Sequence, residues 1–214
     1  MPELTQATVY VVDDDEAILE SLGALFSSVG MKVGTFASAQ AFLDFLDKQS
    51  APCIGCLLVD VRMPGLSGLE LQAQVAQRQP HLPVIVVTGH GDIAMAVRAM
   101  KAGAKDFIEK PFNEQTLLEQ VQACLAENWR TQQELDELQS TQARLGQLTQ
   151  RERSVLNLLM QGKPSKVIAD DLGISPKTVD VHRSNIMDKV KVRSLAELIR
   201  RVVKLEKSNL HQSG

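Results

Sequence analysis

The sequence contains no long hydrophobic run and little cysteine. No apolar stretch among the 214 residues approaches the ~20 residues that a membrane-spanning helix requires. The N-terminus lacks a basic region followed by an apolar one, which is the pattern of a secretory signal. Three cysteines are an odd number and do not indicate a disulfide framework. Cys53 and Cys56 have the spacing of half a zinc site or a redox pair, but no second pair accompanies them. We therefore expect a cytoplasmic protein that does not associate with a membrane.

Net charge is small, but it is unevenly distributed along the chain. The total of −3 combines −9 in residues 1–148 (10 Lys and Arg against 19 Asp and Glu) with +6 in residues 149–214 (13 against 7). The chain is long enough for two small domains, each with its own hydrophobic core. An acidic front and a basic back predict two domains with different partners, and the basic one is suited to a polyanion.

Short apolar runs alternate with helical patterns through the first half of the chain. The runs predict strands near residues 8–13, 32–36, 55–60, 83–88 and 106–109. The segments between them predict helices near 16–29, 38–48, 67–78 and 92–102, with a fifth that begins near Asn113. Ser38 and Asn113 are suitable N-caps. Continuous apolar runs are typical of buried parallel strands, so we predict a (βα)5 doubly wound, flavodoxin-like α/β domain.

Polar side chains follow four of the predicted strands. Asp13 and Asp14 come after the first strand, Asp60 ends the third, Thr88 ends the fourth and Lys110 follows the fifth. The carboxyl ends of the strands in an open α/β sheet border one crevice, so these side chains are expected to converge. Three carboxylates, a hydroxyl and an amine suit a divalent cation and a phosphoryl group.

Each of these acids, taken alone, is expected to be a solvated loop carboxylate. A site is favoured only because suitable polar side chains are found at the ends of four strands. Mg²⁺ usually takes one or two carboxylates with waters and phosphate oxygens. A carboxylate can also act as a nucleophile toward a phosphoryl donor. A Mg²⁺-dependent phosphatase is a rival interpretation, but that chemistry usually needs a second acid two residues after the nucleophile, where this chain has Arg62.

A long segment without proline or glycine follows, from Asn113 to about Gly146. It predicts one helix that leaves the first domain as a linker. Two heptad positions mix apolar and polar residues: Val121, Asn128, Leu135 and Gln142 at one, and Leu117, Cys124, Thr131, Leu138 and Leu145 at the other. Half of this seam is polar, so coiled-coil pairing is weakly encoded and a solvated stalk is an equal alternative.

Residues 149–207 have the pattern of a small all-helical domain. Four helices are expected, near 149–160, 165–172, 176–190 and 194–204. Thr149 and Glu152 form a capping box at the start of the first helix. Two short helices joined by a tight glycine-containing turn indicate a helix-turn-helix.

Four segments of the first half resemble the receiver domain of a two-component response regulator: Val-Asp13-Asp14, Asp60-Val-Arg-Met-Pro-Gly, Thr88-Gly-His-Gly and Phe107-Ile-Glu-Lys110-Pro-Phe. The intervals of 28 residues from Asp60 to Thr88 and 22 from Thr88 to Lys110 suit that family. The resemblance covers residues 8–125. It implies that Asp60 accepts a phosphoryl group from a sensor histidine kinase. Thr88 and Lys110 would assist the transfer, and Thr88 and Phe107 would change position afterwards.

The same resemblance implies a bound Mg²⁺. Asp14 would bind the ion directly and Asp13 partly through water, while Asp60 and the backbone carbonyl of Arg62 complete the set. Asp15 extends the acidic pair to three, but the family pattern assigns it no fixed role, and we leave it out of the metal site.

The basic half resembles the LuxR-type DNA-binding domain over residues 146–207. The segments that carry this resemblance are Leu148-Thr-Gln-Arg-Glu-Arg-Ser-Val-Leu and Ile168-Ala-Asp-Asp-Leu-Gly-Ile-Ser-Pro-Lys-Thr-Val-Asp-Val-His-Arg. Both halves together resemble the FixJ/NarL class of transcriptional regulators. The helix that begins at Pro176 would enter the major groove. The side chains that would contact bases or backbone are Lys177, Thr178, Asp180, Val181, Arg183, Ser184, Lys189 and Lys191.

Asp180 departs from the pattern of this family, in which some members have a base-reading lysine. An aspartate can accept a hydrogen bond from a cytosine amino group, but it repels phosphate. It can instead orient Arg183, three residues further along the helix. The sequence leaves both roles open.

The expected molecule is a receiver domain over 1–125, a helical linker over 126–147 and a helix-turn-helix domain over 148–214. It would be a transcriptional regulator and not an enzyme. Phosphorylation would promote a homodimer on double-stranded promoter DNA, where the regulator would meet RNA polymerase. A C-terminal domain that binds a protein instead of DNA is the alternative, although the basic charge of 149–214 argues against it.

Overall fold

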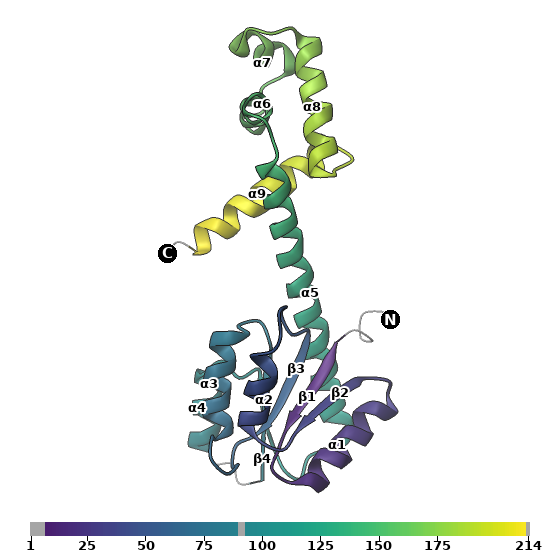
Figure 1. Ribbon diagram of the computed structural model, residues 1–214, viewed down its shortest axis with the longest axis vertical. Helices are drawn as coiled ribbons and strands as arrows, with labels where there is room; N and C mark the ends of the chain where they lie inside the picture. Colours follow the sequence, from purple (N-terminus) through teal and green to yellow (C-terminus); the bar gives the residue numbers. More distant parts are fainter. Residues whose placement is uncertain (1–6, 90–92, 213–214) are drawn as a thin grey trace. The chain divides into compact units, whose positions relative to one another are not determined.

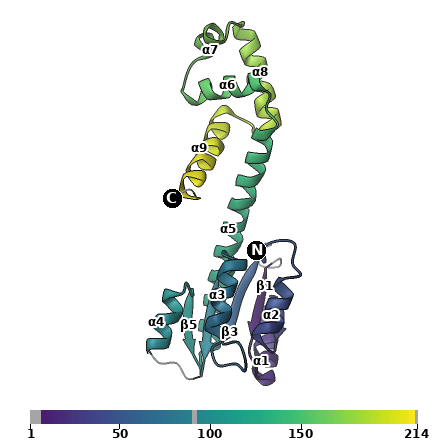
Figure 2. The same ribbon diagram turned by 60° about the vertical axis from the view of Figure 1, so that its left-hand side comes forward.

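The computed structural model describes residues 7–89 and 93–212 (Figures 1 and 2). The chain forms two compact units, which divide between Gln133 and Glu134. Residues 90–92 lie outside the described residues; they include the end of the Thr88-Gly-His-Gly segment and the expected first residue of the 92–102 helix. Within the described ranges, no helix is both long and apolar enough to cross a membrane.

Five parallel strands form the sheet of the first unit, in the order β2-β1-β3-β4-β5. The strands are β1 (Thr8–Val12), β2 (Lys32–Phe36), β3 (Gly55–Asp60), β4 (Val84–Thr88) and β5 (Asp106–Glu109). Val12 pairs with Phe36 and Val59, and Thr88 pairs with Glu109, so the carboxyl ends of the strands meet at one edge. Nearly every residue of β1, β3 and β4 is buried, which explains why these strands are apolar throughout.

Helices cover both faces of this sheet. α2 (Ala39–Leu46), α3 (Gly68–Arg78) and α4 (Ile93–Lys101) pack on one face, and α1 (Glu16–Ser28) packs on the other with the first part of α5 (Glu114–Gly146) (Figure 1). Alternate residues of β1 serve the two sides: Tyr10 and Val12 join the cluster beneath α2, α3 and α4, while Val9 and Val11 join the cluster beneath α1 and α5. The predicted (βα)5 doubly wound fold is confirmed.

Local caps determine where the helices of this unit begin. Asp15 caps α1 by accepting a hydrogen bond from the Ala17 amide at 2.9 Å. Ser38 caps α2, and Asn113 accepts a hydrogen bond from the Thr116 amide at 3.0 Å, so both predicted N-caps are confirmed. Such side chains satisfy amides that have no partner inside the helix, and each contributes on the order of 1 kcal/mol.

The second unit contains the end of α5 and four further helices: α6 (Gln150–Met160), α7 (Ser165–Leu172), α8 (Pro176–Val190) and α9 (Leu195–Gln212). Its core combines apolar side chains from all four, among them Val155, Leu156, Ile168, Val179, Ile186, Leu198 and Val202. The capping box of Thr149 and Glu152 is present. α7 ends at Gly173, whose φ of 64° allows the tight turn into α8. The helix-turn-helix prediction is confirmed, but α9 continues to Gln212 instead of ending near residue 204.

The first part of the linker helix α5 buries its heptad residues within the first unit. Leu117 and Val121 are buried against the sheet. The Asn128 side chain is also buried, where it accepts a hydrogen bond from the Gly55 amide at 2.8 Å and donates one to the His81 carbonyl. A continuous coiled coil along the whole seam is therefore excluded, because its first half already packs inside the unit.

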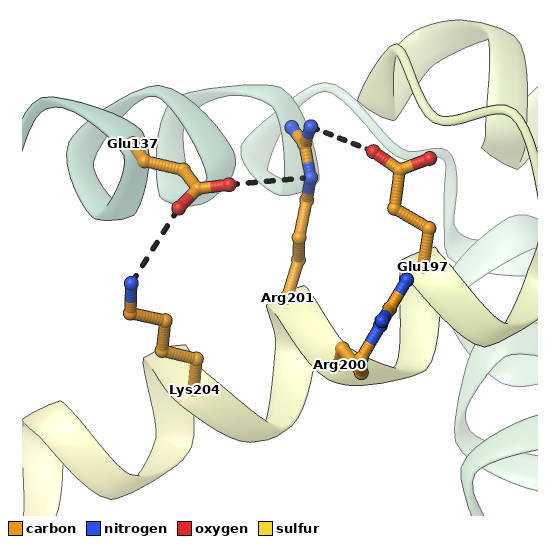
Figure 3. Close-up of a pocket in the computed structure, with 5 residues that line it drawn as sticks. All are labelled: Glu137, Glu197, Arg200, Arg201 and Lys204. Atoms are coloured by element: carbon orange, nitrogen blue, oxygen red, sulfur yellow. Dashed lines mark hydrogen bonds and ion pairs between the residues drawn. The ribbon is translucent and has the colours of Figure 1, made fainter. Parts of the chain in front are cut away.

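The last turns of α5 form ion pairs with α9 in the second unit. The Glu137 carboxylate lies 3.6 Å from Arg201 Nε and 3.5 Å from Lys204 Nζ (Figure 3). Arg201 also pairs with Glu197 on its own helix at 2.8 Å. Together with Arg200, these side chains line a surface pocket of about 330 Å³. Ion pairs that remain in contact with water contribute little stability, roughly 0–1 kcal/mol each.

Candidate functional site

The strand ends of the first unit bring two carboxylates, an ammonium group and a hydroxyl to one edge of the sheet. Asp13 follows β1, Asp60 ends β3, Thr88 ends β4 and Lys110 follows β5. The Lys110 Nζ lies 2.7 Å from Asp13 Oδ2 and 3.0 Å from Asp60 Oδ1. One ammonium group thus bridges carboxylates that come from two different strands.

This bridge is largely shielded from water. The side chains of Asp13 and Asp60 are 6% and 9% exposed, and that of Lys110 is 21% exposed. Burial by itself would lower the pKa of Lys110, but the hydrogen bonds from its ammonium group to Asp13 and Asp60 outweigh that effect and raise the pKa above its usual value. Lys110 therefore stays charged at neutral pH and offsets one of the two carboxylates, which leaves a site that favours a further cation.

Asp60 is held on both of its oxygens. Its Oδ1 faces Lys110, and its Oδ2 accepts a hydrogen bond from the Arg62 amide at 2.6 Å. The loop that follows folds back on the strand end, where the Gly68 amide donates to the Val61 carbonyl at 3.0 Å. A Cβ atom at Gly68 would lie 2.1 Å from the Asp60 carbonyl oxygen, so only glycine fits there. The sequence did not reveal this close approach.

Thr88 and Phe107 lie on the neighbouring strands β4 and β5. Thr88 is buried, and its backbone carbonyl accepts a hydrogen bond from the Lys110 amide at 2.8 Å. Phe107 pairs in register with Val86 and is half-buried against the cluster beneath α2, α3 and α4. The two residues of the predicted switch therefore lie on adjacent strands, and Phe107 is opposite the residue two positions before Thr88.

The oxygen donors at this edge fit Mg²⁺. Asp13 and Asp60 direct carboxylates toward the same point, and Asp14 is exposed beside Asp13. Among the residues that the structure describes, no three His, Cys, Asp or Glu side chains are gathered closely enough to enclose a metal ion by themselves. Mg²⁺ does not need such a cage, because it usually keeps several waters and takes only one or two carboxylates.

Asp15 supports the site without joining it. Its side chain caps α1, and its backbone amide donates a hydrogen bond to Asp13 Oδ1 at 3.0 Å. The family pattern assigned this residue no role. Its place directly before the apolar periodicity of a helix was the signal for an N-cap.

Cys53 and Cys56 cannot act as a pair. Cys53 belongs to the cluster beneath α2, α3 and α4, whereas Cys56 belongs to the cluster beneath α1 and α5 on the opposite face of the sheet. Cys56 instead contacts Cys124, and burial together with this contact raises the pKa of the Cys56 thiol.

α8 presents most of the predicted DNA-contacting side chains to solvent. Ser175 caps this helix and Pro176 occupies its first turn, as expected. Val181 is 52% exposed although it is apolar. The other predicted side chains divide into the exposed Lys177, Asp180, Ser184 and Lys191 and the half-buried Thr178, Arg183 and Lys189.

Lys189 has an internal partner that the sequence did not reveal. Its Nζ lies 2.7 Å from the carboxylate of Glu152, whose side chain is 4% exposed. The hydrogen bond from Lys189 lowers the pKa of Glu152, so this carboxyl group is ionised at neutral pH. Its charge is therefore offset inside the unit, which conflicts with the expectation that Lys189 is available to a phosphate.

Comparison with known protein families gives the same two parts. Residues 9–122 match the response regulator receiver domain, and residues 146–202 match the bacterial regulatory proteins of the luxR family. The chain is 47% identical over 203 residues to the transcriptional regulatory protein FixJ of Azorhizobium caulinodans, covering 94% of this chain and 92% of that protein. It is 43% identical over 203 residues to the response regulator protein TmoT of Ectopseudomonas mendocina, covering 95% and 91%.

Solved structures of similar sequence cover both parts of the chain. The low-resolution structure of the response regulator StyR matches with a TM-score of 0.80 at 45% identity, over 93% of this chain and 99% of that one. Full-length FixJ from B. japonicum matches with a TM-score of 0.57 at 40% identity, over 94% and 98%.

Proposed function

The chain belongs to the two-component response regulators that join a receiver domain to a LuxR-type DNA-binding domain, and we propose that phosphorylation of Asp60 controls its binding to promoter DNA. Members of this family are transcriptional regulators and not enzymes. The receiver domain implies a histidine kinase as a partner, and the LuxR-type domain implies DNA. The observation that carries the proposal is the position of Asp60, at the end of β3 with one oxygen against the Lys110 ammonium group.

Asp60 would act as the nucleophile. One of its carboxylate oxygens attacks the phosphorus of a phosphohistidine on the kinase, the P–N bond breaks, and the imidazole leaves with the electron pair. The product is an aspartyl phosphate. Lys110 would turn from the Asp60 carboxylate to the phosphoryl oxygens while it remains bound to Asp13.

Mg²⁺, when bound, would neutralise charge on the phosphoryl oxygens. The carboxylates of Asp13, Asp14 and Asp60 and the backbone carbonyl of Arg62 would hold it. The Asp13 carboxylate already has a fixed orientation, because the Asp15 amide and the Lys110 ammonium group each donate a hydrogen bond to one of its oxygens.

Thr88 and Phe107 would carry the signal across the sheet. Thr88 follows Val87, which pairs with Asp60, so Thr88 lies at the same edge of the sheet as the phosphoacceptor. A hydrogen bond from this hydroxyl to the phosphoryl group would draw Thr88 toward Asp60. Phe107 would then turn further into the interior, which changes the surface formed by β5 and α4.

α4 would supply the dimer contact. Its exposed apolar side chains are Ile93, Val97 and Met100, which are 86%, 45% and 47% exposed. A symmetric homodimer would remove this surface from water and bring two copies of α8 to two half-sites. RNA polymerase would meet the bound dimer at the promoter, in the cytoplasm.

α8 would lie in the major groove of that DNA. Lys177 and Lys191 are exposed and would contact phosphates, while Thr178, Val181 and Ser184 would face base edges. The charge of +6 over residues 149–214 supports a polyanionic partner. Lys189 would contribute less to phosphate contacts than the other two lysines, because Glu152 offsets its charge.

Substitution of the nucleophile tests the proposal. Asp60→Asn keeps the shape of the side chain and an oxygen for the Arg62 amide, but it removes the carboxylate. Intact-mass measurement after incubation with acetyl phosphate and Mg²⁺ should show one added phosphoryl group on the wild type and none on this variant. Asp15→Asn is the matched control, because it removes a nearby charge, keeps an N-cap and leaves the nucleophile intact. A stable phosphoryl group on the Asp60→Asn chain would refute the assignment.

A further inference from the structure

A polar cluster outside the phosphoacceptor site lies where α7 and α8 meet. Arg183 Nη1 donates a hydrogen bond to the Ser165 hydroxyl at 2.9 Å, and this hydroxyl donates to Asp180 Oδ1 at 3.1 Å. The same Arg183 nitrogen lies 3.6 Å from Asp180 Oδ1. The three side chains form a closed triangle between the first residue of α7 and the second turn of α8.

We propose that Asp180 is a positioning residue for DNA recognition: it holds the Arg183 guanidinium group in a fixed orientation and does not read a base itself. This inference rests on the proposed binding of α8 in the major groove. It gives a role to an acidic side chain on a surface that is expected to face phosphates.

An unpaired aspartate on such a surface would be unfavourable. The Asp180 side chain is 62% exposed, and its charge has the same sign as that of DNA. Arg183 is only 32% exposed and lies beside it, so the pair presents no net charge to the groove. Ion pairs in contact with water add little to folding stability. The triangle is therefore explained better by the orientation of Arg183 than by stability.

The triangle leaves most of the guanidinium group available. Arg183 has five N–H donors in one plane, and both contacts involve Nη1. The donors on Nε and Nη2 can still bind guanine O6 and N7 or a pair of phosphate oxygens. A side chain whose plane is already fixed loses less conformational entropy when it binds.

Direct reading of cytosine by Asp180 is less compatible with this geometry. A carboxylate that accepts a hydrogen bond from the cytosine amino group must direct an oxygen toward the base. Oδ1 already receives the Ser165 hydroxyl and faces Arg183. Any contact to a base would have to use Oδ2 and would keep a negative charge in the groove.

Binding of the full-length chain to two DNA duplexes tests the assignment. All binding is measured with acetyl phosphate and Mg²⁺ present, because the proposed function makes DNA binding depend on phosphorylation. One duplex is selected from a random-sequence library with the wild-type chain, and the other is a scrambled duplex of the same base composition. Asp180→Ala should lower the ratio of the affinity for the selected duplex to the affinity for the scrambled duplex by about tenfold. Without Asp180, the Arg183 guanidinium group is no longer held in place, and loss of one bidentate contact to a base reduces discrimination by that order. In the Arg183→Ala background the same substitution should change this ratio by less than about twofold.

Two further variants separate positioning from charge and from folding. Ser165→Ala removes one corner of the triangle and should lower the affinity ratio in the same direction by a smaller factor. Asp188→Ala removes the same charge from an exposed position of α8 outside the triangle, so it should change both affinities alike and leave their ratio unchanged. The midpoint of thermal unfolding should be the same for all of these variants, which a purely structural role for Asp180 would not allow.

Each of the alternative roles predicts a different result. An equal loss of the affinity ratio with and without Arg183 would mean that Asp180 reads a base itself. An unchanged ratio, or tighter binding to both duplexes as for Asp188→Ala, would mean that Asp180 acts only through its charge. If the wild-type chain enriches no duplex from the library, the proposed DNA binding fails and this inference fails with it.

Discussion

Removal of the Lys110 ammonium group should destabilise the first unit and stop phosphoryl transfer. Lys110→Met keeps an unbranched side chain but leaves Asp13 and Asp60 facing each other, since both touch the same Nζ at 2.7 and 3.0 Å. The two oxygens lie no more than about 6 Å apart, and two unit charges at that limit repel each other by about 3 kcal/mol at an effective dielectric constant of about 20. We expect the free energy of unfolding to fall by about 2–4 kcal/mol, which is also the order of loss when a buried pair loses one partner.

Urea unfolding of the full-length chain, followed by tryptophan fluorescence, measures this loss. The lone tryptophan, Trp129, belongs to the first unit, so its fluorescence reports the unfolding of that unit. Adding Asp13→Asn to Lys110→Met should restore most of the stability, because it removes one of the two repelling charges. Lys105→Met is the matched control: Lys105 pairs with Glu127 at 2.6 Å, but both side chains are about half exposed, so the loss should stay below about 1 kcal/mol.

The reasoning would be refuted by either of two results. A loss below about 1 kcal/mol in Lys110→Met would mean that the carboxylates do not need the ammonium group. A large loss that Asp13→Asn does not relieve would mean that the cause is packing around Lys110 and not repulsion. Mg²⁺ provides a second readout, because an added cation at this edge should stabilise Lys110→Met more than the wild type.

Three further results are expected. Acid should weaken the second unit, because Lys189 lowers the pKa of Glu152: the stabilisation is present above the unfolded pKa of about 4.3 and is lost as pH falls through the lower folded pKa. Glu152→Gln should flatten this part of the stability profile, measured by circular dichroism. Sedimentation should show mainly monomer without phosphodonor and mainly dimer with it, and Val97→Asp should prevent the dimer; a dimer that ignores phosphate would contradict the switch. Glu137→Gln should cost no more than about 1 kcal/mol in urea unfolding, because its ion pairs with α9 remain in contact with water; a larger loss would mean that these pairs hold the helices together.

The strands and helices were predictable because their signals lie within a few residues. Caps such as Ser38 and Asn113 act on amides within one turn of the helix, and a strand buried on both faces must be apolar throughout. The end of α9 was predicted less well. Its start was close to the expected residue, but no proline or glycine marks its end before Gly214, so the helix runs past residue 204 to Gln212.

The residues of the candidate site could be predicted once the strands had been located along the chain. Residues at the carboxyl ends of parallel strands must meet at one edge, so the approach of Asp13, Asp60 and Lys110 followed from the alternation of strands and helices. The sequence did not reveal that one ammonium group bridges both carboxylates. It also did not reveal that Gly68 is required by a close approach to the Asp60 carbonyl.

The sequence by itself determined the type of each element, the residues at the strand ends and the caps that start the helices, because these depend on short-range hydrogen bonds and on the periodicity of side chains. Only the tertiary structure decided which distant side chains meet. Asn128 binds the Gly55 amide across 73 residues, and Lys189 binds Glu152 across 37. The Arg183 contact to Ser165 spans 18 residues and two helices. Such contacts depend on how the elements pack against one another, and the distance between two side chains in space is not a property of their separation along the chain.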